Sequence, residues 1–408
     1  MEVEHLEPVS VQRVQQEAVG KPIGSLYVHV PFCAHKCDYC AFYSAPPSGD
    51  VIDRYVRALV RELELIAPRC RPDTVFFGGG TPSLLNLRQW ETILKSMERL
   101  QLLGAAEWSV ESNPATVSLD KAKLWRSFGI NRVSMGVQSL DADLLDRLGR
   151  IHSREMVFRS YEILRQAGFE NVNIDLMFAI PGQTMELWNR TLDEALALGS
   201  EHLSCYEVIY EEDTPLYHQL KAGQFDVDED LACAMYDVLI DRSASAGYRQ
   251  YEVANFASDR GGHGTFPSLA CQHNLGYWLG EPSFGCGPSA CEFIDGVRSR
   301  NWANTTLWIE QLERGHRAKE FAEALPPEAA AGELAAFGLR LNAGWSFAEF
   351  ESRSGFDLRV AWKTELDELV ARGWAEYTPE RFRLNRRGHR FADSAAELLL
   401  RPGLPIGR

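Results

Sequence analysis

The sequence lacks any run of 18 or more apolar residues, the length that a helix needs to cross a bilayer. Its first 20 residues are rich in glutamate, glutamine and valine, and they contain no apolar core like that of a secretory signal peptide. We therefore expect a cytoplasmic protein without a membrane-spanning segment. A peripheral contact with a membrane surface stays open.

Basic residues are also scarce. The 408 residues include 42 lysines and arginines against 57 aspartates and glutamates, which leaves a net charge of -15. This balance argues against a broad nucleic-acid-binding surface, so we expect no nucleic-acid partner. One basic cluster near the C-terminus is compatible with anionic lipid headgroups, although a solvated face is the commoner arrangement. The cluster consists of Arg381, Arg383, Arg386, Arg387 and Arg390.

Nine cysteines are few for a chain of this length, and their spacing shows no disulfide framework. Three of them lie close together, and the other six are scattered. This pattern favours a reducing compartment over secretion. The scattered cysteines are Cys70, Cys205, Cys233, Cys271, Cys286 and Cys291.

The three clustered cysteines are Cys33, Cys37 and Cys40, with the spacing Cys-x3-Cys-x2-Cys. They follow an apolar run, residues 26–30, that reads as a strand. Three thiolates leave a structural zinc site one ligand short. They suit a cubane iron-sulfur cluster in which three irons are held and the fourth is open. A zinc-bound or metal-free loop is the alternative.

The chain continues as alternating strand and helix patterns, and its amino-acid composition changes near residue 328. The repeats predict a parallel sheet in a partial (β/α)6 barrel, followed by an α+β domain of winged-helix type. We expect domains at 1–22 (a flexible arm), 23–245 (the barrel), 246–327 (a connecting region) and 328–408. The predicted barrel strands are 26–30, 74–77, 108–111, 132–137, 172–178 and 202–209.

Ligands of such barrels bind at the carboxyl ends of the strands. There the sequence places the cysteine loop, three glycines at 78–80, Glu111 and Gln138, with Asp175 inside a strand. Glycines let a backbone approach a ligand, a carboxylate suits ribose hydroxyls, and Arg150 suits a ligand carboxylate. Each feature alone also fits a tight turn, a solvated loop end or a capping group. Together they indicate one bound cofactor.

These motifs resemble those of the radical S-adenosylmethionine superfamily, in the branch of oxygen-independent coproporphyrinogen III oxidase and the HemW haem chaperones. They are Tyr-Val-His-Val-Pro-Phe at 27–32 with the cysteine loop, Gly-Gly-Gly-Thr-Pro-Ser at 78–83, Glu-Ser-Asn-Pro at 111–114, Asn-Arg-Val-Ser-Met-Gly-Val-Gln-Ser at 131–139, and Asp-Leu-Met at 175–177 with Pro-Gly-Gln-Thr at 181–184. The resemblance implies a [4Fe-4S] cluster on Cys33, Cys37 and Cys40, with S-adenosylmethionine on the fourth iron. It implies cofactor contacts by Tyr27, Tyr39, Gly79, Gly80, Thr81, Glu111, Gln138, Arg150 and Asp175.

Within this branch two departures favour the chaperones. The oxidase pattern has a further cysteine two positions after the third, where this chain has Phe42. The oxidase also has a longer segment before the first strand. The resemblance therefore implies haem as cargo, delivered to haem-dependent respiratory enzymes. The alternative is a radical oxidoreductase of the coproporphyrinogen III dehydrogenase type, so it stays open whether the chain is an enzyme. It also stays open whether the chain forms a homodimer.

Two stretches of the second half also resemble chaperone signatures, Tyr-Glu-Val-Ala-Asn-Phe-Ala at 251–257 and His-Asn-Leu-Gly-Tyr-Trp at 273–278. In the second, His273 offers an imidazole for haem iron, and Tyr277 and Trp278 offer flat faces for a porphyrin. A structural histidine packed with two aromatics is the alternative. Residues 258–272 exceed the family spacing and are expected to be a surface insertion, or a mobile loop with extra ligands His263 and Cys271.

Overall fold

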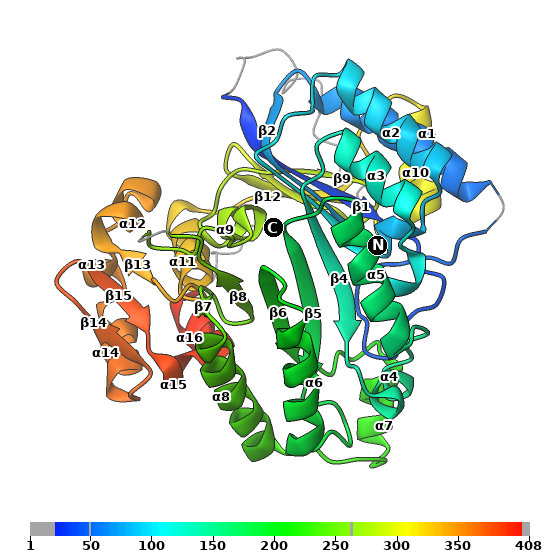
Figure 1. The fold of residues 1–408 in the computed structure, drawn as a ribbon. Helices are drawn as coiled ribbons and strands as arrows, with labels where there is room; N and C mark the ends of the chain where they lie inside the picture. Colours follow the sequence, from blue (N-terminus) through cyan, green and yellow to red (C-terminus); the bar gives the residue numbers. More distant parts are fainter. Residues whose placement is uncertain (1–20, 49, 262–263, 402–408) are drawn as a thin grey trace, which may run out of the picture.

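The computed structural model describes residues 21–48, 50–261 and 264–401. All but two residues of the predicted arm 1–22 lie outside this part of the chain. The barrel is one sheet of nine strands in the order β7-β8-β6-β5-β4-β3-β2-β1-β9 (Figure 1). No helix in the described ranges is both long and apolar enough to span a membrane.

Six neighbouring strands of this sheet are parallel, which confirms the predicted partial (β/α)6 barrel. They are β1 (Ile23–Val30), β2 (Cys70–Gly79), β3 (Glu107–Ser112), β4 (Arg132–Gln138), β5 (Val172–Phe178) and β6 (His202–Glu207). The sequence pattern did not reveal the edges. There β9 (Phe284–Cys286) pairs parallel with β1, while β8 (Asn255–Ser258) and β7 (Tyr248–Gln250) run antiparallel beyond β6.

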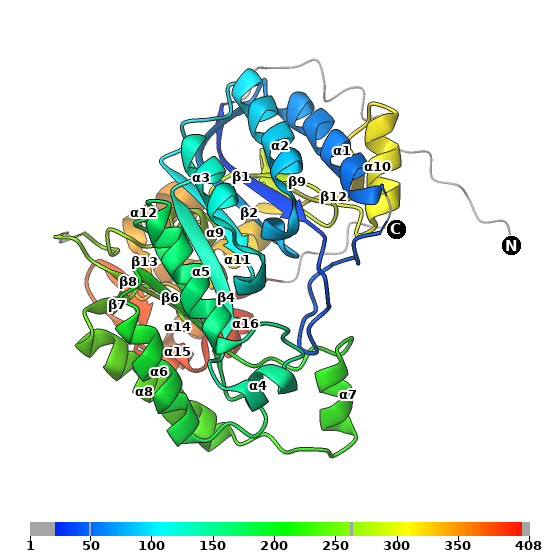
Figure 2. The same cartoon turned by 45° about the vertical axis from the view of Figure 1, so that its right-hand side comes forward.

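Helices cover the outer face of the sheet (Figures 1 and 2). Their apolar stripes and the outward residues of the strands form the main core, which includes the contacting rings of Phe77, Trp90, Trp108 and Trp125. These helices include α1 (Val51–Ile66), α2 (Leu87–Arg99), α3 (Leu119–Ser127), α5 (Arg154–Gln166), α6 (Met185–Ala197) and α8 (Glu229–Ser245). The short helices α4 (Ala142–Arg147) and α7 (Pro215–Lys221) lie at the carboxyl ends of the strands, where they contribute to a separate apolar cluster (Figure 2).

The two faces of each barrel strand differ in chemistry because side chains alternate along a strand. In β5, Val172, Ile174 and Leu176 are buried in the main core. Asn173 and Asp175 of the same strand face the barrel interior, where they line a cavity. The interior is therefore polar, and this is where a ligand site can form.

After β8 the chain forms helix α9 (Gln272–Trp278), which packs against β2. A small antiparallel sheet follows, made of β10 (Cys291–Ile294), β11 (Val297–Asn301) and β12 (Lys319–Ala324), with α10 (Thr305–Glu313). The buried carboxylate of Glu62 on α1 accepts hydrogen bonds from the Gly287 amide (2.8 Å) and Asn301 Nδ2 (3.0 Å). These two hydrogen bonds hold the small antiparallel sheet against the barrel.

The C-terminal segment has its own cluster of buried residues, around Trp345, Phe350, Trp362 and Leu366. It consists of helices and a small antiparallel sheet, and it lies beside α9, β7 and β8 (Figure 1). The elements are α11 (Pro327–Gly338), β13 (Trp345–Ser346), α12 (Phe347–Ser354), α13 (Leu358–Ala361), α14 (Lys363–Ala371), β14 (Ala375–Tyr377), β15 (Arg381–Leu384), α15 (Arg386–His389) and α16 (Ala392–Leu399). The boundaries of the four predicted domains stay predictions.

The basic cluster of this segment is used largely within the protein. Arg386 pairs with Asp241 of α8 (2.6 Å), and Arg390 pairs with Asp237 of the same helix. Arg383 pairs with Glu376 (2.8 Å). These ion pairs neutralise much of the charge that suggested contact with anionic lipids, because three of the five guanidinium groups already face a carboxylate.

Candidate functional site

A single cavity of about 740 Å³ occupies the barrel interior, from the carboxyl ends of the strands down to α9. It brings together every residue that the sequence suggested for a cluster, for S-adenosylmethionine or for haem. These residues are Tyr27, Cys33, Cys37, Tyr39, Cys40, Gly79, Gly80, Thr81, Glu111, Gln138, Arg150, Asp175, His273, Tyr277 and Trp278. Their roles stay predictions, but their convergence is a property of the fold.

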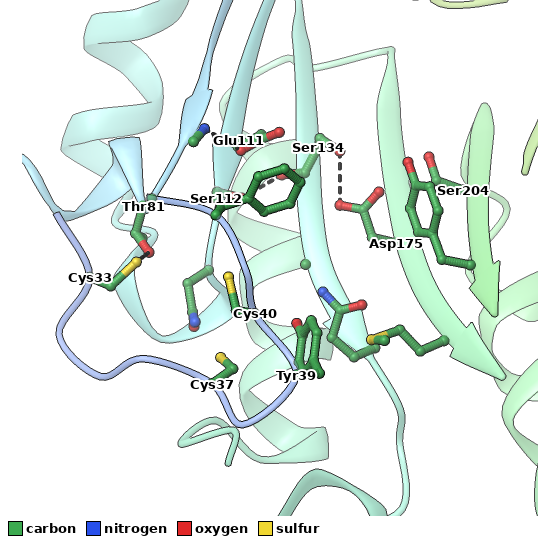
Figure 3. A pocket seen from close by; sticks show the side chains of 18 of the residues that line it. Cys33, Cys37, Tyr39, Cys40, Thr81, Glu111, Ser112, Ser134, Asp175 and Ser204 are labelled. Atoms are coloured by element: carbon green, nitrogen blue, oxygen red, sulfur yellow. Dashed lines mark hydrogen bonds between the residues drawn. The ribbon is translucent and has the colours of Figure 1, made fainter. Parts of the chain in front are cut away.

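The three cysteines lie on the loop after β1, at the mouth of the cavity (Figure 3). Cys33 Sγ lies 3.6 Å from Thr81 Oγ1, and Arg150 Nη1 donates to Cys37 Sγ at 3.5 Å. Burial raises the pKa of the Cys33 and Cys40 thiols. Within the described residues, no three Cys, His, Asp or Glu side chains are grouped closely enough to hold a single metal ion.

Backbone bonds hold the cysteine loop against two neighbours. The Asp38 amide donates to the Leu148 carbonyl (3.1 Å), and the Leu216 amide donates to the Asp38 carbonyl (2.9 Å). On the other side, the amides of Gly80 and Thr81 donate to the carbonyls of Val30 and Phe32, both at 2.8 Å. The loop therefore has a defined shape that does not depend on a ligand.

The structure gives a steric reason for the glycines at 78–80 that the sequence did not reveal. A Cβ on Gly79 would lie 2.4 Å from the ring of His29, and the residue has a φ of +101°. A Cβ on Gly80 would lie 2.7 Å from the Val30 carbonyl oxygen. These glycines therefore let β2 end in close contact with β1 and its loop, in addition to any approach to a ligand.

Two carboxylates face the cavity from neighbouring parts of the sheet. Glu111 accepts a hydrogen bond from the Gly79 amide (3.1 Å), and Asp175 accepts from Ser134 Oγ (3.0 Å) and Asn173 Nδ2 (2.6 Å) (Figure 3). Burial and the charge of Asp175 raise the pKa of Glu111 to about 8. Burial also raises the pKa of Asp175. Two adjacent acids are suited to hydroxyl and amine donors of a ligand.

Arg150 lies between the cysteine loop and the end of β4. Besides its contact with Cys37, its Nη2 donates to the Gly136 carbonyl (2.5 Å), and its Nε has no partner among the described residues. At this point β4 is irregular, because its register with β5 shifts between Gly136 and Gln138, and Gln138 has a φ of +65°. Such irregularities redirect side chains, here toward the cavity.

The opposite end of the cavity is closed by α9 and its neighbours. His273 is 2% exposed, and its Nδ1 lies 3.1 Å from both Ser25 Oγ and Thr74 Oγ1. Its Nε2 has no partner within the described chain, and its ring stacks on Phe76 with centroids 5.2 Å apart. Burial lowers the pKa of His273 to about 3, so the imidazole is neutral at physiological pH.

The two ends of the cavity are well separated. Ser25 is at the start of β1, beside His273, whereas the cysteine loop begins after Val30. Five residues of strand span roughly 16 Å. The cavity is therefore long enough along the strands to contain two distinct binding regions.

Glu107 fixes α9 in this position. Its buried carboxylate accepts hydrogen bonds from the amides of Gln272 (2.9 Å) and His273 (3.0 Å), and Cys271 Sγ lies 3.4 Å from it. Cys271 is fully buried at the start of α9, so it belongs to neither a surface insertion nor a mobile loop. His263 lies outside the described residues.

Sequence reasoning missed several residues of the interior. Arg132, Ser134 and Ser204 line the cavity from β4 and β6, and Arg340 of the C-terminal segment stacks over Trp278 at 4.9 Å. The signal was present in β4, where polar or small residues at 132, 134 and 136 alternate with apolar residues at 133, 135 and 137.

Two family models match the chain. The model of the radical SAM superfamily matches residues 27–195, and that of the HemN C-terminal domain matches residues 325–391. Among solved structures, Escherichia coli coproporphyrinogen III oxidase (HemN) has a TM-score of 0.80 at 22% identity. The match covers 93% of this chain and 90% of that one. At this identity the likeness establishes the shared fold alone.

Proteins of similar sequence are more informative about the family than the structural match. Heme chaperone HemW of Bacillus subtilis is 34% identical, over 86% of this chain and 92% of its own. Heme chaperone HemW of Escherichia coli is 32% identical, over 94% and 99%. The zebrafish mitochondrial radical S-adenosyl methionine domain-containing protein 1 is 32% identical, over 85% and 79%. The chain therefore belongs to the radical SAM superfamily and, within its HemN-like branch, to the HemW family.

Proposed function

We propose that this protein binds haem inside the barrel and delivers it to haem-dependent respiratory enzymes. The observation that carries the proposal is His273, a neutral imidazole whose Nε2 has no partner and which lines a cavity beside Tyr277 and Trp278. Imidazole nitrogen is a common axial ligand of haem iron, and aromatic rings pack well on a porphyrin face. The names of several relatives of similar length include haem chaperone.

A [4Fe-4S] cluster fits the donor set at the mouth of the cavity. Three thiols from one loop face the cavity, and Phe42, which is 71% exposed, stands where a further cysteine occurs in the oxidase pattern. No fourth cysteine therefore follows on the same loop. When bound, such a cluster holds one iron open and supplies a one-electron donor next to S-adenosylmethionine. Thr81 and Arg150, which contact two of the thiols, would stabilise the thiolates that hold it.

S-adenosylmethionine would occupy the same end of the cavity. We assign its contacts to the residues that the resemblance suggested, because all of them line the cavity. Glu111 would accept from the ribose hydroxyls, while Asp175 would accept from the ligand's amino group. Apart from Tyr27, whose ring centroid lies 6.4 Å from that of His273, these contacts leave the region near His273 for haem, about 16 Å along the strand from the cysteine loop.

The second candidate is a radical oxidoreductase acting on coproporphyrinogen III. It is favoured by the complete set of cofactor-facing residues, of which none is missing from the cavity. To separate the two functions, we would supply the reconstituted protein with haem and, separately, with coproporphyrinogen III, S-adenosylmethionine and a reductant. The proposal expects stable haem binding and no decarboxylated porphyrin. Stoichiometric 5′-deoxyadenosine with protoporphyrinogen would reject it.

The His273→Ala variant should bind haem at least about tenfold more weakly, because an axial ligand of the iron is lost. Its Soret band should shift, since the remaining ligands differ. Haem titration followed by absorbance measures both effects. His316→Ala, on an exposed surface away from the cavity, is the control and should behave like the parent protein. Unchanged affinity and spectrum in His273→Ala would remove this residue from the proposal.

S-adenosylmethionine affinity should rise with pH from 6 to 8 and level off above. Glu111 has a pKa of about 8 in the empty protein because of burial and Asp175, so it is protonated below that value. Ribose hydroxyls donate best to the ionised carboxylate, so binding below pH 8 must release a proton. The dependence approaches about tenfold per pH unit. Calorimetry in two buffers of different ionisation enthalpy measures the release.

The matched variant for this experiment is Glu111→Gln, which keeps an acceptor but cannot titrate. Its affinity should be weaker at high pH, and it should not change between pH 6 and 8. A parent protein that binds S-adenosylmethionine equally well across this range would contradict the assigned role of Glu111.

A further inference from the structure

Arg132 is a buried cation without an ion-pair partner. It is 2% exposed, and no carboxylate of the described chain lies within 4.0 Å of its guanidinium. Its one hydrogen bond is from Nη1 to Ser109 Oγ, at 3.3 Å, and its Nε has no partner among the described residues. A charge in this state is costly, because burial removes hydration and a single hydrogen bond to a neutral hydroxyl replaces only part of it.

The nearest acids are already engaged elsewhere. Glu107 accepts the amides at the start of α9, and Asp175 accepts from Ser134 and Asn173. Burial is the largest single effect and disfavours the charged form of Arg132, but Cys271, Glu107, Tyr251 and Asp175 act through space in the opposite direction, and the pKa of Arg132 is raised overall. None of these groups contacts the guanidinium as an ion pair. Since Arg132 lines the cavity, a ligand can supply an anion in direct contact with it.

The register of the strands places Arg132 near His273. Across the sheet, Tyr27 of β1 pairs with Phe76 of β2, Phe76 pairs with Ser109 of β3, and Ser109 pairs with Arg132 of β4. Phe76 is the residue on which the His273 ring stacks. The charge of Arg132 also helps to lower the pKa of His273, after burial, which agrees with their proximity.

The methionine carboxylate of S-adenosylmethionine is not placed to reach this cation. Arg150, which contacts Cys37, bonds the Gly136 carbonyl, and Gly136 is four residues further along β4 than Arg132. Four residues of strand span roughly 13 Å. The methionine carboxylate would therefore lie near Arg150, and a different anion must serve Arg132.

We propose that Arg132 binds a carboxylate of the tetrapyrrole cargo, one of the propionates of haem. This inference rests on the proposed haem-binding function and deepens it. With the iron near His273, a propionate at Arg132 neutralises the buried charge through a charge-assisted hydrogen bond, which is strong in a site shielded from water. Arg132 thereby selects tetrapyrroles that carry a free acid and sets the orientation of the ring in the barrel.

The test compares haem with its dimethyl ester, in which both propionates are blocked. The parent protein should bind haem at least about tenfold more tightly than the ester. In Arg132→Met, haem affinity should fall and ester affinity should not, so the two values should agree within about twofold. Arg132→Lys keeps a cation and should retain part of the preference.

Controls separate this role from a structural one. Arg159→Met, on the exposed face of α5, should keep the full preference for the free acid. Arg132→Met should still bind iron and S-adenosylmethionine like the parent protein. If it loses S-adenosylmethionine affinity but keeps the preference for haem over the ester, the cargo assignment is overturned. The cargo assignment is also overturned if the ratio of haem affinity to ester affinity in Arg132→Met equals that of the parent protein.

The experiment also distinguishes the two proposals. If the parent protein binds neither haem nor the ester, the haem-binding function itself fails. If it binds both with equal affinity, haem binding stands and the propionate site is wrong. Should Arg132→Met fail to fold, Arg132→Lys and the parental preference still decide the question.

Discussion

A Cys37→Ala variant is expected to lose most of its iron after anaerobic reconstitution, from about four atoms per chain to less than one. Two thiols of the loop would remain, and two ligands do not hold a cubane in water. The broad visible absorption of an iron-sulfur cluster should disappear with the iron. Iron and sulfide analysis, with absorbance and electron paramagnetic resonance of the reduced protein, measures this loss.

The chain offers a matched control for this substitution. Cys291 is exposed and lies outside the cavity, so Cys291→Ala should keep the full iron content. The variants Cys33→Ala and Cys40→Ala should behave like Cys37→Ala. Metal analysis of the parent protein also tests the zinc alternative. Iron retained by Cys37→Ala, or zinc as the metal of the parent protein, would contradict the proposed cluster.

A Glu107→Ala variant is expected to lower the free energy of unfolding by about 3 kcal/mol. The reason is that the amides of Gln272 and His273 would lose their acceptor inside the protein. Buried donors without partners carry the full penalty of their lost hydration. Haem affinity should fall as well, because α9 presents His273 to the cavity. Urea denaturation followed by circular dichroism measures the stability.

Two variants sharpen this prediction. Glu107→Gln keeps one acceptor oxygen and should lose about half as much stability as Glu107→Ala. Glu98→Ala, on the exposed face of α2, should change the stability by less than about 0.5 kcal/mol. An effect of Glu107→Ala as small as that of Glu98→Ala would show that the carboxylate does not hold α9.

Elements with a strong local pattern were accessible from the sequence. Helix α1 has a pattern of this kind, because its buried side chains Tyr55, Leu59, Leu63 and Ile66 recur at helical spacing. The six parallel strands were recognised for the same kind of reason, although β2 extends beyond the predicted 74–77 to Cys70–Gly79. Strand ends are less certain, since hydrogen bonds to neighbouring strands decide them.

Segments whose structure depends on distant partners were not accessible. The strand β9 has three residues and exists only because β1 offers it an unpaired edge. The buried position of Cys271 likewise depends on Glu107, which is 164 residues away along the chain. Local spacing therefore suggested an insertion, whereas long-range contacts bury its end against the barrel.

The sequence by itself determined the family, the cysteine loop and the residues at the carboxyl ends of the strands, because these signals are local motifs in a fixed order. Tertiary structure alone decided how they combine. It placed His273 and Arg132 at the same level of the sheet, at the far end of one cavity, which follows from the strand register and from the docking of α9 on Glu107. It also left the charge of Arg132 without a partner, a state that no local pattern encodes, because ion pairing depends on distances between strands.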